Sequence, residues 1–138
     1  VAKMYTKDHN NIEYIKINFA DFEQIPQVDS IYCLALFPHF TLYDIFTHLT
    51  ELYNCLKPGG QLFFDTRSDQ YINFKSNKWL ADTRKSVKIP NYNFTNLKYH
   101  NTKIIKQMIE SVGFDIVNIF DSGTHSFFHI GRPYENNK

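Results

Sequence analysis

Three polar side chains follow apolar stretches that predict strands, a position from which a folded chain presents groups to a ligand. His39 comes after Val28–Leu36, and Asp65 and Arg67 end Gln61–Thr66. Histidine titrates closest to neutral pH, so His39 is our candidate for acid–base chemistry at a hydroxyl acceptor. The alternative is a histidine that only fills the entry to a helix. Asp65 and Arg67 lie two residues apart and therefore share a face, where they can orient a polar acceptor.

Other kinds of chemistry have less support in the sequence. His125 and His129 lie four residues apart in a predicted strand, which is about 13 Å and too far to share a metal ion. No Gly-x-Ser-x-Gly elbow supports nucleophilic hydrolysis. Cys33 and Cys55 lack the spacing of a redox or zinc motif. We interpret them as buried thiols of a cytoplasmic protein, and we expect no metal.

The segment Arg67–Asn101 interleaves aromatic and basic side chains, among them Tyr71 and Trp79. Such a segment can stack nucleic-acid bases, cover a small organic acceptor, or bury its aromatics in a satellite cluster. Fifteen basic and fourteen acidic residues leave a net charge of +1. A near-neutral chain without a basic stripe makes nucleic acid an unlikely partner. No apolar run approaches the roughly 20 residues of a membrane span.

Two amphipathic helices are predicted. In Thr41–Leu56 the apolar residues recur with a 3.6-residue period, and Asp44 stands three positions after Thr41 as in a capping box. Pro58-Gly59-Gly60 is expected to stop this helix. The second helix is Thr102–Val112, with Gly113 as its stop. The first seven residues are expected to be the tail of a further helix.

Strands alternate with these helices. A chain of 138 residues fits one domain, and 43% of it is apolar, enough for a core. The alternation predicts an α/β layered sheet, with a short turn making the last two strands antiparallel neighbours. The predicted strands are Ile12–Ile17, Val28–Leu36, Gln61–Thr66, Phe114–Asp121 and Ser126–Arg132.

The string Leu56-Lys57-Pro58-Gly59-Gly60 closes the first helix and opens a strand. With Val28-Asp29 opening the preceding strand and a carboxyl-terminal hairpin over Phe114–Arg132, the chain resembles the last two-thirds of a class I S-adenosylmethionine-dependent methyltransferase. The glycine turn is architectural rather than catalytic. The family's glycine-rich cofactor loop is absent, because the five glycines form no such motif.

The resemblance implies a Rossmann-like, mostly parallel sheet that lacks its first two strands. Residues 1–138 would be one incomplete domain, with 67–101 as a variable lid or substrate insertion. The strands at Val28, Gln61, Ser126 and Phe114 would lie side by side in that order, and the strand at Ile12 would lack a neighbour. The Val28 strand would then expose an apolar edge. We expect either upstream residues or self-association through this edge.

The resemblance also implies where S-adenosylmethionine would bind. After the third family strand, Asn18 would accept a hydrogen bond from the adenine amine, with Asp21 as the fallback, and Phe19 would stack on the ring. The end of the next strand would supply the second group of contacts. That group consists of Ala35, Leu36 and Phe37. The alternatives are a polar strand-end residue for Asn18 and a core residue for Phe19.

The predicted function is transfer of the methyl of S-adenosylmethionine to a small-molecule acceptor, with His39 as the base. Asp65, Arg67, Tyr71 and Trp79 would contact the acceptor. The alternative is a non-catalytic, methyltransferase-like interaction module, which the missing glycines favour. A nicotinamide-dependent enzyme is disfavoured by the Lys-Pro-Gly-Gly turn and the terminal hairpin.

Overall fold

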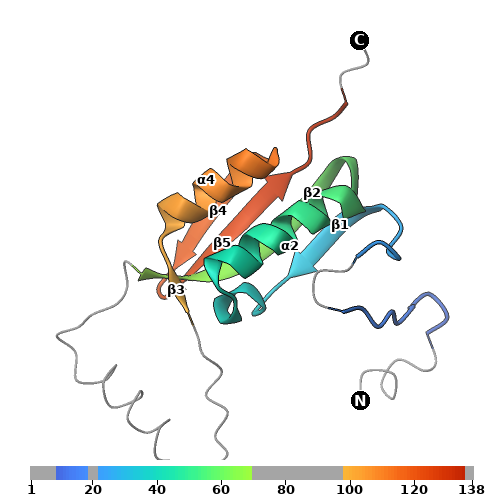
Figure 1. The fold of residues 1–138 in the computed structure, drawn as a ribbon, viewed down its shortest axis with the longest axis horizontal. Helices are drawn as coiled ribbons and strands as arrows, with labels where there is room; N and C mark the ends of the chain where they lie inside the picture. The colour runs from blue at the N-terminus through green and yellow to red at the C-terminus, as the bar shows by residue number, and fades with distance from the viewer. Residues whose placement is uncertain (1–8, 19–21, 70–97, 136–138) are drawn as a thin grey trace, which may run out of the picture.

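The computed structural model describes residues 9–18, 22–69 and 98–135. Its elements, in chain order, are β1 (Val28–Cys33), η1 (Phe37–His39), α2 (Leu42–Cys55), β2 (Leu56–Ser68), β3 (Tyr99–His100), α4 (Thr102–Val112), β4 (Asp115–Ser122) and β5 (His125–Gly131). Figure 1 shows α2 and α4 lying side by side across one face of the sheet. The described part is thus an α/β layered structure, as predicted.

The sheet has the strand order that the sequence predicted, β1-β2-β5-β4, with the short β3 beside β2. β2 pairs in parallel with β1 and β3 and antiparallel with β5, while β4 and β5 form the antiparallel hairpin. The stretch after the Lys-Pro-Gly-Gly turn is therefore an interior strand that follows a helix. Among the described residues β1 pairs only with β2, so its other side is an edge of the sheet.

The core lies between the sheet and the two helices. Alternate residues of β2 and β5, including Leu62, Phe64 and Phe128, are fully buried under α2 and α4. Ile45 and Leu49 of α2 meet them, and the rings of Phe64 and Phe128 stack 4.8 Å apart. This packing fixes the register of the strands, because a slip of one residue would turn the apolar side chains outward.

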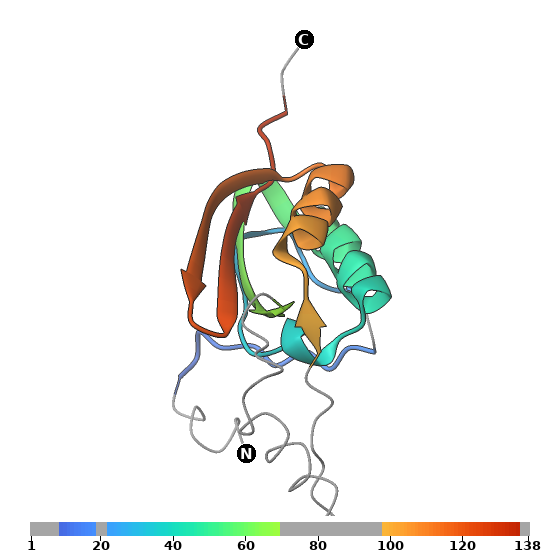
Figure 2. The same ribbon diagram turned by 90° about the vertical axis from the view of Figure 1, so that its left-hand side faces the viewer.

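No helix among the described residues covers the opposite face of the sheet, as Figure 2 shows. We call it the open face. Tyr32 stacks on Phe63 at 4.8 Å, and Phe63 stacks on His129 at 4.3 Å, so a row of rings crosses three strands. Three exposed apolar side chains line the same hollow as these rings: Leu34, Phe120 and Phe127.

Two predicted helices are present with small changes at their ends. α2 begins after Thr41, whose hydroxyl accepts from the backbone N–H of Asp44 while the Asp44 carboxylate accepts from the backbone N–H of Thr41, a complete capping box. α4 has the predicted bounds, and Gly113 ends it with a left-handed φ of 107°. Both ends confirm the reading of local sequence signals.

The Pro-Gly-Gly turn does not itself stop α2. The helix ends at Cys55, and Arg132 donates to the carbonyls of Tyr53 and Leu56. Leu56 is already extended, and the backbone of Gly59 and Gly60 pairs with Arg132 beyond β5. Bonds from a distant residue therefore end the helix earlier than the glycines predict.

Three predicted strands need correction. Ile12–Ile17 forms no strand, since it joins no sheet among the described residues. The strand predicted over Val28–Leu36 ends at Cys33, because Ala35 adopts a positive φ of 57°. The strand predicted over Gln61–Thr66 extends over all of Leu56–Ser68. In the hairpin, β4 begins and ends one residue later than predicted, and β5 begins and ends one residue earlier.

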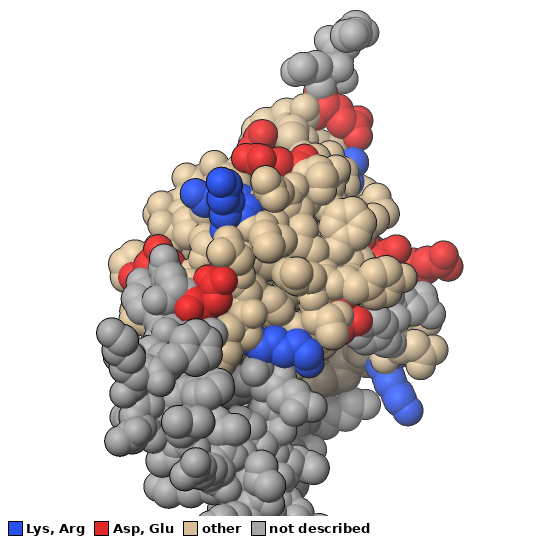
Figure 3. Space-filling model, turned by 60° about the vertical axis from the view of Figure 1, so that its left-hand side comes forward, with Lys and Arg blue, Asp and Glu red and all other residues tan. Residues whose placement is uncertain are grey.

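Some predictions fall outside the described residues. The helix tail expected over the first seven residues lies outside them. Most of the segment 67–101, predicted as a lid or substrate insertion, also lies outside them, and only its two ends are described, in and next to β2 and β3. No described helix is long and apolar enough to cross a membrane. On the surface shown in Figure 3, acidic and basic side chains are scattered among residues of other types.

Candidate functional site

The chain reverses sharply where β1 ends, and this places a buried carboxylate. Ala35 is the one non-glycine residue with a positive φ in the described ranges. Its backbone N–H donates to Oδ1 of Asp65 at 2.6 Å, and the Asp65 residue is only 4% exposed. A left-handed alanine is strained, and such strain is common at functional sites. The ends of β1 and β2 thus meet around one carboxylate.

An imidazole from the terminal hairpin lies beside this carboxylate. Nε2 of His125 is 3.9 Å from Oδ2 of Asp65, and its Nδ1 is 3.0 Å from the hydroxyl of Thr124. We call Ala35, Asp65, Arg67 and His125 the carboxyl edge. His125 was considered in the sequence only as a metal ligand. The register of β5 on β2, which sets His125 opposite Arg67, brings it to this site.

Arg67 is held by an aromatic side chain rather than by Asp65. Its Nη1 donates to the hydroxyl of Tyr99 at 3.1 Å, and the guanidinium carbon lies 5.6 Å from the centre of the Tyr99 ring. Because Asp65 and Arg67 alternate with Thr66 along β2, both point to the same side of the sheet, as predicted. The arrangement leaves the guanidinium fixed beside the carboxylate without an ion pair between them.

His39 lies in η1, directly after the turn that follows β1. Its carbonyl accepts from Nζ of Lys98 at 3.0 Å, and the backbone N–H of Lys98 donates to the carbonyl of Pro38. Nδ1 of His39 is buried and has no hydrogen-bond partner among the described residues. The backbone of η1 is therefore held by Lys98, which is 59 residues further along the chain, while Nδ1 of the His39 imidazole has no hydrogen bond to a described residue.

Buried polar atoms without a partner gather at this end of the sheet. Within the described ranges they are Nδ1 of His39, Oγ1 of Thr66, Nε of Arg67 and Nε2 of His100. Burial lowers the pKa of His100, so its imidazole is neutral at physiological pH. Such orphaned groups are costly and commonly mark a ligand or water site. Nothing in the sequence singled out His100, which lies in β3 at the end of the segment Arg67–Asn101.

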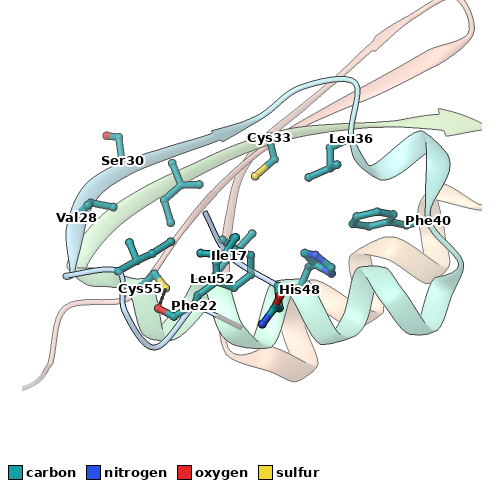
Figure 4. Close-up of a pocket in the computed structure, with 13 residues that line it drawn as sticks. Ile17, Phe22, Val28, Ser30, Cys33, Leu36, Phe40, His48, Leu52 and Cys55 are labelled. Carbon is teal, nitrogen blue, oxygen red and sulfur yellow. Dashed lines mark hydrogen bonds between the residues drawn. The ribbon is translucent and has the colours of Figure 1, made fainter. Parts of the chain in front are cut away.

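A separate cavity of about 500 Å³ lies between β1, α2 and the segment before β1, as Figure 4 shows. Its walls are mainly apolar, with Asn18, Ser30 and His48 as the polar residues. Burial raises the pKa of the Cys33 thiol to about 11, so this lining residue is uncharged at neutral pH. The cavity thus suits an apolar, planar group with few polar contacts.

The predicted cofactor residues occupy different places. Asn18 and Leu36 both line the cavity. Phe37 is fully buried in the core against Phe64, so only its backbone is available to a ligand. Ala35 contributes its strained backbone at the carboxyl edge. Four further residues that were predicted to contact a ligand lie outside the described residues: Phe19, Asp21, Tyr71 and Trp79.

Comparison with known proteins agrees with this fold. Residues 1–64 match the family model described as a methyltransferase domain. No curated protein matches the sequence. An O-methyltransferase family protein from Burkholderia thailandensis has a similar structure, with a TM-score of 0.69 and 17% identity over 99% of this chain and 41% of its own.

Two further solved structures are similar. Magnesium protoporphyrin IX methyltransferase from Synechocystis PCC 6803, with bound S-adenosylhomocysteine, has a TM-score of 0.64 and 12% identity over 95% of this chain and 57% of its own. The N-methyltransferase NodS from Bradyrhizobium japonicum WM9 has a TM-score of 0.60 and 16% identity, and the match covers 96% of this chain and 66% of NodS.

Residues 1–64 match a methyltransferase domain model, and the described residues share their fold with S-adenosylmethionine-dependent methyltransferases of known structure, which supports the class I methyltransferase domain that the sequence resemblance predicted. The chain spans 40–49% of the length of the first three structures that it matches.

Proposed function

We propose that this chain takes part in S-adenosylmethionine-dependent methyl transfer to a small-molecule acceptor. The observation that carries the proposal is the carboxyl edge, where the strained Ala35, just beyond the end of β1, meets the buried Asp65 of the parallel strand β2. Ligands of open α/β sheets bind beyond these strand ends. The family match supports the same cofactor and chemistry.

The cavity beside β1 fits the adenosine end of the cofactor in its chemistry. Its apolar walls suit a purine ring, and the carboxamide oxygen of Asn18 can accept from the adenine amine, with Leu36 as an apolar contact. Phe19 and the backbone at Ala35 and Phe37 complete the proposed set. When bound, the cofactor supplies a methyl group already activated on a sulfonium.

The remaining proposed roles concern the acceptor. His39 is proposed to take the acceptor's proton, and its orphaned Nδ1 supports this role. Asp65 and Arg67 are proposed to orient the acceptor from one side of β2, with Tyr71 and Trp79 contributing from the following segment. Positioning in a site that excludes water would provide most of the rate enhancement.

Calorimetric titration with S-adenosylhomocysteine tests the proposal on this chain. We expect saturable binding that Asn18→Ala weakens about tenfold, the value of one lost hydrogen bond to a buried ligand. Asn10→Ala, an exposed turn residue, is the matched control and should bind like the wild type. Equal affinities of the two variants would remove Asn18 from the site. Absence of binding by the wild type would contradict cofactor use by this chain.

The second candidate is a methyltransferase-like interaction module without catalysis. The edge of β1 and the exposed aromatic open face favour it, because both are surfaces that associate readily. Absence of calorimetric binding together with self-association in solution would support this candidate over the enzyme.

A further inference from the structure

The Asp65 carboxylate is almost fully buried and accepts one hydrogen bond from the described residues. Oδ1 accepts from the backbone N–H of Ala35 at 2.6 Å. Among the described residues the nearest charged partner of Oδ2 is His125, at 3.9 Å, which is too long for a hydrogen bond. A carboxylate has about four acceptor sites, and the contact from Ala35 occupies only one of them. The side chain of Asp65 is 5% exposed, and Oδ2 is not among the fully buried atoms that lack a partner, so a donor on a ligand can reach it.

His125 supplies the complementary group across this gap. Its Nδ1 is 3.0 Å from Oγ1 of Thr124, and about a third of its side chain is exposed, so a ligand can reach it. When the Thr124 hydroxyl donates to Nδ1, the single proton of the neutral ring lies on Nε2, which faces Asp65. The gap is then bounded by one acceptor, Oδ2, and one donor, Nε2–H.

A single oxygen atom can bridge the two groups. Two atoms 3.9 Å apart both lie within hydrogen-bonding distance of an oxygen placed about 2.8 Å from each. We infer that Asp65 and His125 together hold one hydroxyl group of the acceptor, which donates to Oδ2 and accepts from Nε2–H. This inference rests on the proposed function, and it specifies a hydroxyl-bearing acceptor.

The pair discriminates against related groups. A methyl ether has no proton to donate, so it would leave Oδ2 unsatisfied, and a carboxylate would be repelled by the charge of Asp65. A site built for a hydroxyl rejects analogues that lack it far more strongly than an apolar pocket rejects a change of shape.

Phenol, anisole and benzoate are the probes, and the full chain is titrated with each while the His125 ring is followed in ¹H–¹⁵N NMR spectra. We expect phenol to shift the His125 signals and to bind at least about tenfold more tightly than anisole or benzoate. Asp65→Asn retains an oxygen for the Ala35 N–H but should abolish the preference. His9→Gln, which alters an exposed histidine, should retain it.

His125→Gln is the second variant, for which the preference for phenol is measured on backbone signals. Equal binding of phenol and anisole, no shift with any probe, or a preference that survives in both variants would overturn the inference. S-adenosylhomocysteine binding is measured separately by calorimetry. A chain that binds it without preferring phenol overturns only this inference, whereas a chain that prefers phenol without binding it overturns the proposed function.

Discussion

At the scale of single residues, Ala35 has the most informative conformation. Its φ of 57° lies in the left-handed region, which costs an L-residue roughly 1–2 kcal/mol. The hydrogen bond from its N–H to the buried Asp65 compensates for part of this cost. The chain therefore accepts local strain at the point where a carboxylate is positioned for a ligand.

Ala35→Gly is expected to raise the free energy of unfolding by about 0.5–1 kcal/mol, because glycine removes the strain and loses only part of that gain to chain entropy. Ala35→Val should lower it, since a β-branched side chain tolerates positive φ even less. Urea denaturation followed by circular dichroism measures both. A glycine variant less stable than the wild type would show that Ala35 is not strained.

At the scale of elements, the Lys-Pro-Gly-Gly turn is fixed by contacts on both sides. Gly59 has a φ of 81°, and a Cβ added there would clash with the ring of Tyr134. At Gly60 an added Cβ would approach the backbone carbonyl of Lys57 at 2.9 Å. The glycines thus serve both backbone conformation and close packing.

Gly59→Ala should therefore destabilise the protein by roughly 1–3 kcal/mol, through backbone strain and overpacking together. Tyr134→Ala in the same chain should recover the packing part only, because the positive φ remains. A double-mutant cycle by urea denaturation separates the two contributions. Additive effects of the two substitutions would show that the Tyr134 ring does not restrict Gly59.

The start of α2 gives a pH-dependent prediction. Hydrogen bonds from the Thr41 side chain and backbone lower the pKa of Asp44 below its ordinary value of 3.8. A lowered native pKa stabilises the fold above the unfolded pKa, and this contribution is lost as acidification protonates the carboxylate.

Thr41→Ala should cost about 1 kcal/mol of unfolding free energy at pH 7, the usual value of a cap. The difference from the wild type should shrink below about pH 4, where Asp44 loses its charge. Urea denaturation across the pH range measures this. A difference that is constant down to pH 2 would contradict the role of the ionised Asp44.

At the scale of the whole molecule, the sheet is covered on one side only by the described helices. Parallel strands are normally buried on both faces, yet Tyr32 is 67% exposed at the edge strand β1. The edge of β1 lies next to the open face, so one partner can cover both. We propose that two copies associate through β1.

Tyr32→Lys should reduce this association, because a lysine at an edge strand opposes pairing. Sedimentation velocity at several concentrations should show dimers for the wild type and mainly monomers for the variant. Tyr43→Lys, on an equally exposed position of α2, is the control and should still dimerise. A wild-type chain that remains monomeric at all concentrations would exclude the proposed association.

Local sequence signals determined much of this protein. The capping residues around Thr41, the periodicity of the two helices and the turn at Ser122-Gly123 each act within a few residues, so the sequence predicted the helices and the hairpin. The strand order was predicted only through the family resemblance. Asp65 and Arg67 were also predicted to share a face, since strand alternation is a local property.

Only the tertiary structure decided how distant groups meet. The end of α2 depends on hydrogen bonds from Arg132. The orientation of Asp65 depends on its hydrogen bond with Ala35, and the position of His125 depends on the register between β5 and β2. The segment Ile12–Ile17 has the composition of a strand but joins no sheet within the described ranges. Composition and periodicity describe what a segment can form, whereas long-range hydrogen bonds and packing determine which of those forms gains enough stability to persist.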